Sequence, residues 1–328
     1  MGIRMKRFAA TVPVLLVVLL VFASAAATQP APRAARIGML CNPLCNVSFN
    51  DAFLDELRKL GWVEGTTVVI ERKDPDYRLD RLPALAADLV RSKPNLIVTF
   101  TPQAARAAKD ATSDIPIVVI FVADPVGMGL APSLAHPGGN LTGVTTLVPG
   151  GFSEKMLETL RQLLPQAKRV AVFINPSNEM HRLQFPREAA KLGFQLDVIE
   201  VREAGEMPGA ILAAKARGAE ALFIMADPIF LFPPNRVPDL AAQVGLPSLS
   251  FERSFVQGGG LIAYGPDFFA IARRGAHYVD RILKGAKPAE LPIEQPTKYL
   301  LLINLKMAKS LGIEIPASLL ARADEVIE

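Results

Sequence analysis

Short runs of apolar residues alternate with amphipathic segments along the chain from residue 36 onward. The runs are rich in β-branched residues and mostly apolar, as in strands buried on both faces of a sheet; they lie at 36–40, 68–71, 96–100 and 115–122. Between them apolar residues recur at helical spacing, which predicts helices at 49–60, 82–90 and 103–111. Strands and helices that alternate at these lengths predict right-handed βαβ units, and therefore an α/β fold with parallel sheets.

The second half of the chain repeats this order of elements at a period of about 130 residues. Arg36–Leu40 is echoed by Arg169–Phe173, and Leu60-Gly61-Trp62 is echoed by Leu192-Gly193-Phe194, each ahead of a further strand-like run. The period is too long for a solenoid. It predicts two similar Rossmann-like lobes, each with its own core.

A Pro/Gly-rich stretch at 124–151 joins the two halves. After the second lobe come another strand, a long helix and a strand–helix pair, at 261–264, 268–283 and 299–311. Elements that follow a complete lobe indicate that the chain crosses back, so we expect more than one hinge strand. The expected first lobe is 36–146 plus 252–280, and the expected second lobe is 147–251 plus 281–328.

Residues 1–27 have the three parts of a secretory signal peptide: a basic head, an apolar run at 14–22, and small residues that fit a cleavage site. They carry three of the 36 basic residues and none of the 32 acidic ones, so cleavage lowers the formal net charge from +4 to +1. A nearly neutral mature protein removes the electrostatic case for a nucleic-acid partner. The alternative is an uncleaved anchor, because an apolar stretch of about 20 residues can span a bilayer.

The two cysteines, Cys41 and Cys45, are too few for a disulfide-built scaffold or a four-ligand zinc site. In an oxidising compartment they could form a local disulfide across a turn. Two inert thiols, or a redox or metal pair, are the alternatives. Their spacing differs from that of a thioredoxin motif, and no histidine is nearby.

Ligands of open parallel sheets bind beyond the carboxyl ends of the strands, and two such edges would face each other across a cleft. The residues at these predicted strand ends form the candidate ligand site: Cys41, Asn42, Thr101, Pro102, Gln103, Asp124, Asn175, Ser177, Asn178, Asp227, Phe251 and Glu252.

Thr101 follows a buried strand, and Pro102 stands at the favoured first position of the next helix. The backbone N–H groups at that helix N-terminus suit a carboxylate, although Thr101 could equally serve only as a cap. Asp124 and Asp227 each precede a proline, so each either receives a ligand donor or starts a turn. Glu252 either contacts the ligand or forms an ion pair.

The remaining candidates have similar alternatives. Ser177 and Asn178 form a weaker copy of the Thr101 pattern, for which a cap is the simpler interpretation. Phe121, Phe230 and Phe251 could stack on a flat ligand or belong to the core. No G-x-S-x-G, G-x-x-x-x-G-K-[ST] or H-E-x-x-H motif occurs, and three scattered histidines offer little to a metal. We therefore expect neither catalysis, nor a cofactor, nor a metal.

Several longer stretches then point to one family. They are Leu60-Gly61-Trp62 with Glu64-Gly65, Thr101-Pro102 with Ala104-Ala105, Asp124-Pro125-Val126-Gly127, Pro137–Val144, Gly259-Gly260-Leu261 with Tyr264-Gly265, Ile282–Pro288 and Arg322–Glu328. In order and spacing the chain resembles the bacterial ABC-transporter substrate-binding proteins of the tryptophan/tyrosine-binding type, over essentially the whole mature length.

The resemblance implies a type I periplasmic-binding-protein fold with three crossovers, in a periplasmic monomer that closes on a small amino-acid-like or aromatic carboxylate and delivers it to an ABC permease of the inner membrane. It also implies that Thr101 helps to hold the carboxylate. An acidic residue near the 251–253 crossover would receive the amine, a place that Glu252 could fill, although the stretch 249–254 departs from the family pattern. A nucleotide-dependent periplasmic enzyme and a membrane-anchored sensory ectodomain are the alternative functions.

Overall fold

The computed structural model describes Gly2 and residues 34–41, 45, 48–76, 78–146, 152–178, 181 and 189–328. Apart from Gly2, the expected signal peptide lies outside the described residues, as does the candidate site residue Asn42. Ala35–Glu328 form one compact unit. None of the helices in the described ranges is long and apolar enough to cross a membrane.

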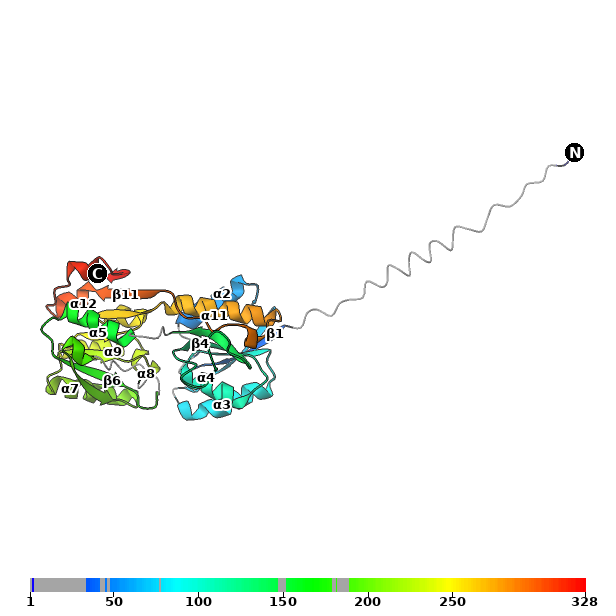
Figure 1. The fold of residues 1–328 in the computed structure, drawn as a ribbon, viewed down its shortest axis with the longest axis horizontal. Coiled ribbons are helices and arrows are strands. Elements are labelled where there is room, and N and C mark those ends of the chain that lie inside the picture. The colour runs from blue at the N-terminus through cyan, green and yellow to red at the C-terminus, as the bar shows by residue number, and fades with distance from the viewer. Residues whose placement is uncertain are drawn as a thin grey trace. The chain divides into compact units, whose positions relative to one another are not determined.

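The first sheet has the strand order β2-β1-β3-β4-β5, and its paired strands are all parallel. Its strands are β1 (Ala35–Leu40), β2 (Val68–Lys73), β3 (Leu96–Thr99), β4 (Ile117–Val122) and β5 (Leu141–Thr145). The helical segments that belong to it are α2 (Ser48–Lys59), η1 (Leu79–Arg81), α3 (Leu82–Arg91), α4 (Pro102–Ala111), α11 (Phe268–Leu283) and η4 (Pro288–Glu290). One core cluster joins the sheet to α2 and α11 and another joins it to α3 and α4, so helices cover both faces (Figure 1).

The second sheet has the order β12-β11-β10-β9-β8-β6-β7 and is parallel except for the antiparallel pair β10–β11. Its strands are β6 (Arg169–Ile174), β7 (Gln195–Glu200), β8 (Ala221–Ile224), β9 (Ser248–Ser250), β10 (Ile262–Pro266), β11 (Tyr299–Asn304) and β12 (Glu325–Ile327). Its helical segments are α5 (Phe152–Leu163), η2 (Ala189–Leu192), η3 (Ala204–Glu206), α7 (Met207–Ala216), α8 (Pro228–Leu231), α9 (Arg236–Gln243), α10 (Arg253–Gln257), α12 (Leu305–Ser310) and α13 (Ala317–Leu320).

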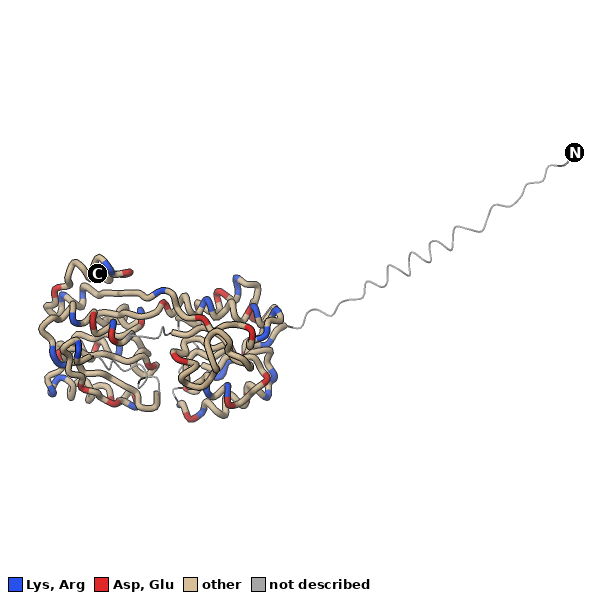
Figure 2. Tube along the Cα trace, in the orientation of Figure 1, with Lys and Arg blue, Asp and Glu red and all other residues tan. Residues whose placement is uncertain are grey.

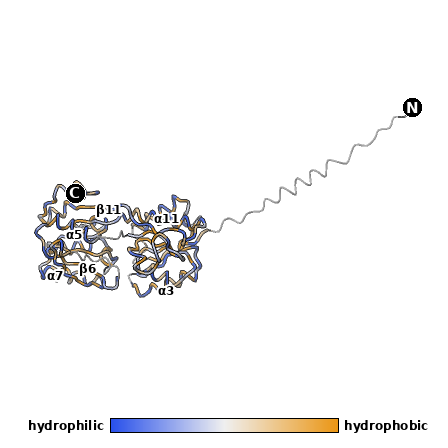
Figure 3. The backbone as a smooth tube through the Cα atoms, in the orientation of Figure 1, coloured by the Kyte–Doolittle hydropathy of each residue, from blue (hydrophilic) through white to orange (hydrophobic). Residues whose placement is uncertain are grey.

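The predicted repeat is present in the sheets. The order β7-β6-β8-β9-β10 matches β2-β1-β3-β4-β5 strand for strand, because each lobe begins its sheet with the same three βα connections. Hydrophobic residues run through the interior of both lobes (Figure 3), and the central strands β3, β4, β8 and β9 are buried along their whole length. Basic and acidic residues are interspersed over the two lobes (Figure 2). The predicted α/β class with parallel sheets in two lobes is therefore confirmed.

The boundaries expected after residue 251 are wrong. Residues 253–266 belong to the second lobe, because β10 pairs with β9 and β11, and the side chains of Phe255 and Val256 lie in its core. Residues 281–294 belong to the first lobe, where Leu291 joins the core and Glu294 bridges to Val144. The chain crosses between the lobes in the segment after Thr145, at Asp267, and again between Glu294 and Tyr299.

Candidate functional site

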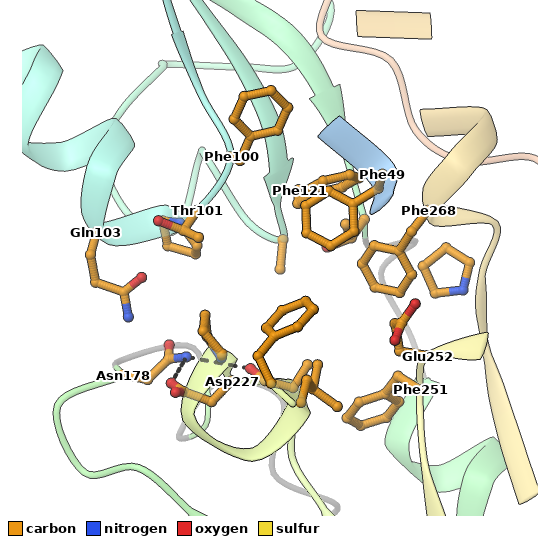
Figure 4. Close-up of a pocket in the computed structure, with 18 residues that line it drawn as sticks. Phe49, Phe100, Thr101, Gln103, Phe121, Asn178, Asp227, Phe251, Glu252 and Phe268 are labelled. Carbon is orange, nitrogen blue, oxygen red and sulfur yellow. Dashed lines mark hydrogen bonds between the residues drawn. The ribbon is translucent and has the colours of Figure 1, made fainter. Parts of the chain in front are cut away.

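A cavity lies at the carboxyl edges of the two sheets and is lined by residues of both lobes (Figure 4). Its empty space, including the solvent at its mouth, is about 860 Å³. The lining residues are Phe49, Phe100, Thr101, Pro102, Gln103, Phe121, Ala123, Thr146, Asn178, Ala226, Asp227, Pro228, Leu231, Phe232, Phe251, Glu252, Pro266 and Phe268.

Six phenylalanines dominate this lining. The ring of Phe121 is at their centre, with ring centroids 4.8 Å from Phe49, 5.3 Å from Phe268 and 6.1 Å from Phe100. Phe49 of the first lobe also meets Phe232 of the second lobe edge to face, at 5.9 Å. Aromatic rings prefer such edge contacts, which leave ring faces and edges for a further ring to pack against. The wall therefore suits a flat, apolar ligand group.

The first lobe contributes the N-terminus of α4 to the cavity. The Thr101 hydroxyl caps this helix by accepting a hydrogen bond from the Ala104 N–H at 3.3 Å. Gln103, in the first turn, has a buried side-chain oxygen Oε1 with no hydrogen-bond partner in the described part of the chain. A buried acceptor without a partner is costly, so this oxygen is a point where a ligand donor would gain binding energy.

The second lobe contributes a buried polar network around Asp227. Its Oδ2 accepts hydrogen bonds from the side-chain amides of Asn178 at 2.9 Å and Asn175 at 3.2 Å, and its Oδ1 caps α8 through the Ile229 N–H at 3.1 Å. Asp227 is 2% exposed. A carboxylate offers about four acceptor positions. These three bonds therefore orient Asp227 and leave room for one donor from a ligand.

His181 supports the same network from behind. Its Nδ1 accepts a hydrogen bond from the Asn175 N–H at 2.8 Å, and its Nε2 lies 3.1 Å from the Ala226 carbonyl oxygen. Because a backbone N–H can only donate, Nδ1 must be unprotonated, and the ring proton is assigned to Nε2. Burial lowers the pKa of His181, while the charge of Asp227 opposes the change.

Acidification should therefore destabilise the protein through His181. A histidine with a lowered pKa contributes stability that is fully present above its ordinary value of about 6.5 and is lost as the pH falls, by up to about 1.4 kcal/mol per pH unit. We expect the melting temperature of the wild type to fall more between pH 7 and pH 5 than that of His181→Asn, which keeps an acceptor but cannot be protonated. Parallel curves for the two proteins would contradict this assignment.

Glu252 is the second buried acid of the lining, and it is 3% exposed. Its Oε2 accepts hydrogen bonds from the N–H of Ser254, at 3.1 Å, and from the Ser254 hydroxyl. Burial raises the pKa of Glu252 and these hydrogen bonds oppose the rise. The charge of the adjacent Arg253 also opposes the rise, although its guanidinium forms its ion pair with Glu325.

Seven of the predicted site residues line the cavity: Thr101, Pro102, Gln103, Asn178, Asp227, Phe251 and Glu252. The cap and the ligand interpretations of Thr101 are not exclusive, because it caps α4 and also lines the cavity. Asp227 and Glu252, for which the alternatives were a turn and an ion pair, likewise cap α8 and α10 and line the cavity.

Four other predicted residues do not belong to this lining. Cys41 is buried in a disulfide with Cys45, whose Cα atoms are 5.2 Å apart. Asp124 accepts a hydrogen bond from the Gly127 N–H at 2.8 Å and so starts a turn. Asn175 lies behind Asp227, and Ser177 lines a neighbouring cavity.

The aromatic wall was not predicted from the sequence, because the candidate residues were taken from the predicted ends of strands. Phe49 and Phe268 stand in the first turns of α2 and α11, and Phe232 follows α8, so none of these three ends a strand. Phe100 could have been found, since it directly precedes Thr101. Phe121 and Phe251 belong to the hydrophobic cores of their lobes and also line the cavity, whereas Phe230 is fully buried against Phe173.

Among the described residues, the cavity lining includes two carboxylates and no lysine or arginine. No group of three or more His, Cys, Asp or Glu residues that could hold a metal ion occurs within the described ranges. The site therefore combines an aromatic wall, two buried acids and the N-terminus of a ten-residue helix.

Residues 44–327 match the family model of the ABC transporter substrate binding proteins. A curated tyrosine-binding protein from Clostridioides difficile (strain R20291) is 25% identical over 265 residues, which make up 80% of this chain and 76% of that protein. A conserved domain protein from Vibrio cholerae is 27% identical, with a TM-score of 0.82 over 90% of this chain and 100% of that one. An ABC domain from Streptococcus pneumonia, solved in complex with L-Trp, is 24% identical, with a TM-score of 0.81 and the same coverage.

Proposed function

Because the chain belongs to the family of ABC transporter substrate-binding proteins, we propose that its cavity captures an amino acid with an aromatic side chain. The observation that carries the proposal is the combination of six phenylalanines with polar groups at the N-terminus of α4 and at Asp227. The names of the relatives agree with it, since one is a tyrosine-binding protein and another was solved with L-Trp.

We assign the ligand carboxylate to the N-terminus of α4, where Thr101 and the positive end of the helix dipole favour an anion. The ammonium is assigned to Asp227 and to Oε1 of Gln103. The amine nitrogen and the carboxyl carbon of an amino acid are bonded to the same Cα and lie about 2.5 Å apart. Their partners must therefore be neighbours, and Figure 4 draws Thr101, Gln103 and Asp227 toward one end of the cavity.

An aromatic carboxylate without an amine fits this lining less well. It would bring a further negative charge next to the carboxyl groups of Asp227 and Glu252, and the described part of the lining holds no cationic side chain to balance it. An ammonium group supplies the missing positive charge and a donor for each buried acceptor. We therefore favour amino acids over simple aromatic acids.

Binding would bias the two lobes toward a closed arrangement, and the closed form would dock on a permease of the inner membrane. The signal-like segment at 1–27 supports export to the periplasm, with no nucleic-acid partner. The protein would act as a monomer and catalyse no reaction, since family members of this kind bind and deliver their ligand unchanged.

A thermal-shift and calorimetry panel of amino acids tests the proposal. We expect an aromatic amino acid to stabilise the protein and its des-amino analogue to bind at least about tenfold more weakly. If no aromatic amino acid binds, the proposed function is wrong.

Thr101→Val should lower the affinity for aromatic amino acids by about tenfold, because the substitution removes the hydroxyl and keeps the side-chain volume. A hydrogen bond to a charged group contributes about 1.5–3 kcal/mol. Isothermal titration calorimetry measures the change. Thr66→Val, on a turn between α2 and β2, is the matched control and should bind like the wild type. Unchanged affinity in Thr101→Val would remove the carboxylate assignment.

A further inference from the structure

We propose that Glu252 selects ligands that carry a hydrogen-bond donor on the far end of the aromatic ring, such as a phenol O–H or an indole N–H. The proposal rests on the proposed function and refines the ligand class of the same cavity. This role differs from the one that the sequence resemblance implied for Glu252, which was to receive the amine of the ligand.

The cavity has two ends with different chemistry. A neighbouring cavity shares Pro102, Gln103 and Asn178 with the main one, and a second neighbour shares Phe251, Glu252, Pro266 and Phe268 with it. These two neighbours have no lining residue in common, so they open from different ends. Figure 4 agrees, with Gln103, Asn178 and Asp227 toward one end and Glu252 beside Phe251 and Phe268 at the other.

This separation excludes Glu252 as the partner of the amine when Thr101 holds the carboxylate. The two charged groups of an amino acid lie on one carbon, and Asp227 already stands at the Thr101 end. Glu252 is then reached only by the tip of the side chain, after the ring has passed between the phenylalanines. A ring with a donor at that tip would place the donor against the carboxyl group.

The surroundings of Glu252 increase the effect that such a donor has on ligand affinity. Glu252 is buried, it lines the cavity beside Phe251, Pro266 and Phe268, and Ser254 provides the hydrogen bonds to its Oε2. No ion pair to Glu252 occurs among the described residues, and the adjacent Arg253 is engaged by Glu325. A donor on the ligand would add a hydrogen bond to this acid beyond those of Ser254, which should raise the affinity by about tenfold, and a ligand without a donor would lack that bond.

The experiment compares matched ligands on the full mature chain by isothermal titration calorimetry. Tyrosine and phenylalanine differ only in the phenol O–H, and O-methyltyrosine keeps the oxygen but has no donor. We expect the wild type to bind tyrosine at least about tenfold more tightly than phenylalanine or O-methyltyrosine. In Glu252→Leu the preference should shrink to about twofold, through loss of tyrosine affinity. Glu200→Gln, which changes an exposed acid of the same lobe that pairs with Arg202 outside the cavity, should keep the wild-type preference.

The outcomes are distinct. If wild-type protein binds tyrosine and phenylalanine within about twofold of each other, the role of Glu252 is refuted and the proposed function stands. If none of the aromatic amino acids binds, the proposed function fails and this inference falls with it. If Glu252→Gln lowers the affinities for tyrosine and phenylalanine equally but leaves the affinities for their des-amino analogues unchanged, Glu252 holds the amine and the inference is wrong. Glu252→Gln keeps an acceptor to cap α10, so it provides this readout even if Glu252→Leu does not fold.

Discussion

Replacement of Asp227 by alanine is expected to lower the affinity for aromatic amino acids at least about a hundredfold. The change removes the carboxylate that we assign to the ammonium, and the loss of one partner of a buried charge pair costs about 2–5 kcal/mol. It also releases the side-chain amides of Asn175 and Asn178, whose hydrogen bonds end on Asp227 Oδ2. Calorimetry with the best ligand of the panel measures the effect.

Two further variants separate charge from structure. Asp227→Asn keeps an acceptor for the Ile229 N–H, and so the cap of α8, but it has no charge for an ammonium. It should remain folded and still lose most of the affinity. Asp239→Asn changes an exposed acid of the same lobe, which meets Asn235, and should bind normally. A folded Asp227→Ala protein that binds within about threefold of the wild type would contradict the assignment.

Gly143→Ala should have the largest effect on stability, about 3–5 kcal/mol. Gly143 lies in β5 opposite Val119 of β4, with a φ of +143° that other residues rarely adopt. A Cβ at this position would stand 2.0 Å from the Val119 carbonyl oxygen, which is backbone and cannot move without breaking the β4–β5 pairing. The melting temperature should fall by about 10 °C.

Gly209→Ala is the matched control. Gly209 lies in α7 with nothing within 4 Å of the position of a Cβ, and its φ is ordinary. Alanine there should stabilise the protein by about 0.5–1 kcal/mol, since it reduces the freedom of the unfolded chain. Equal melting temperatures of Gly143→Ala and the wild type would show that the sheet accommodates the side chain.

The polar half of the site could be predicted from the sequence because it follows from sheet geometry. Thr101, Asp227 and Glu252 each come directly after a short apolar run, and carboxyl ends of parallel strands meet at one edge. The family resemblance is confirmed, and the type I periplasmic-binding-protein fold that it implied agrees with the solved relatives.

The aromatic half depends on contacts that periodicity does not encode. Phe49 also lies on the apolar face of its helix, so its spacing is that of a core residue. Its ring becomes cavity wall only because the first turn of α2 extends to the sheet edge, within reach of Phe232. The sequence does not predict the role of His181 either, because that role depends on a local hydrogen bond that its ring accepts from the Asn175 N–H. The lobe boundaries were wrong because strand pairing decides where 262–266 belongs.

The order in which the chain contributes elements to its two lobes affects how the protein can fold during synthesis. Helix α11 supplies Ile271, Tyr278 and Val279 to the core of the first lobe, yet it is encoded after most of the second. The sheet of the second lobe is in turn complete only with β11 and β12, near the carboxyl terminus. Neither half can complete its core until the ribosome has translated residues 268–328. A chain translocated during synthesis would therefore cross the membrane before either lobe could finish folding.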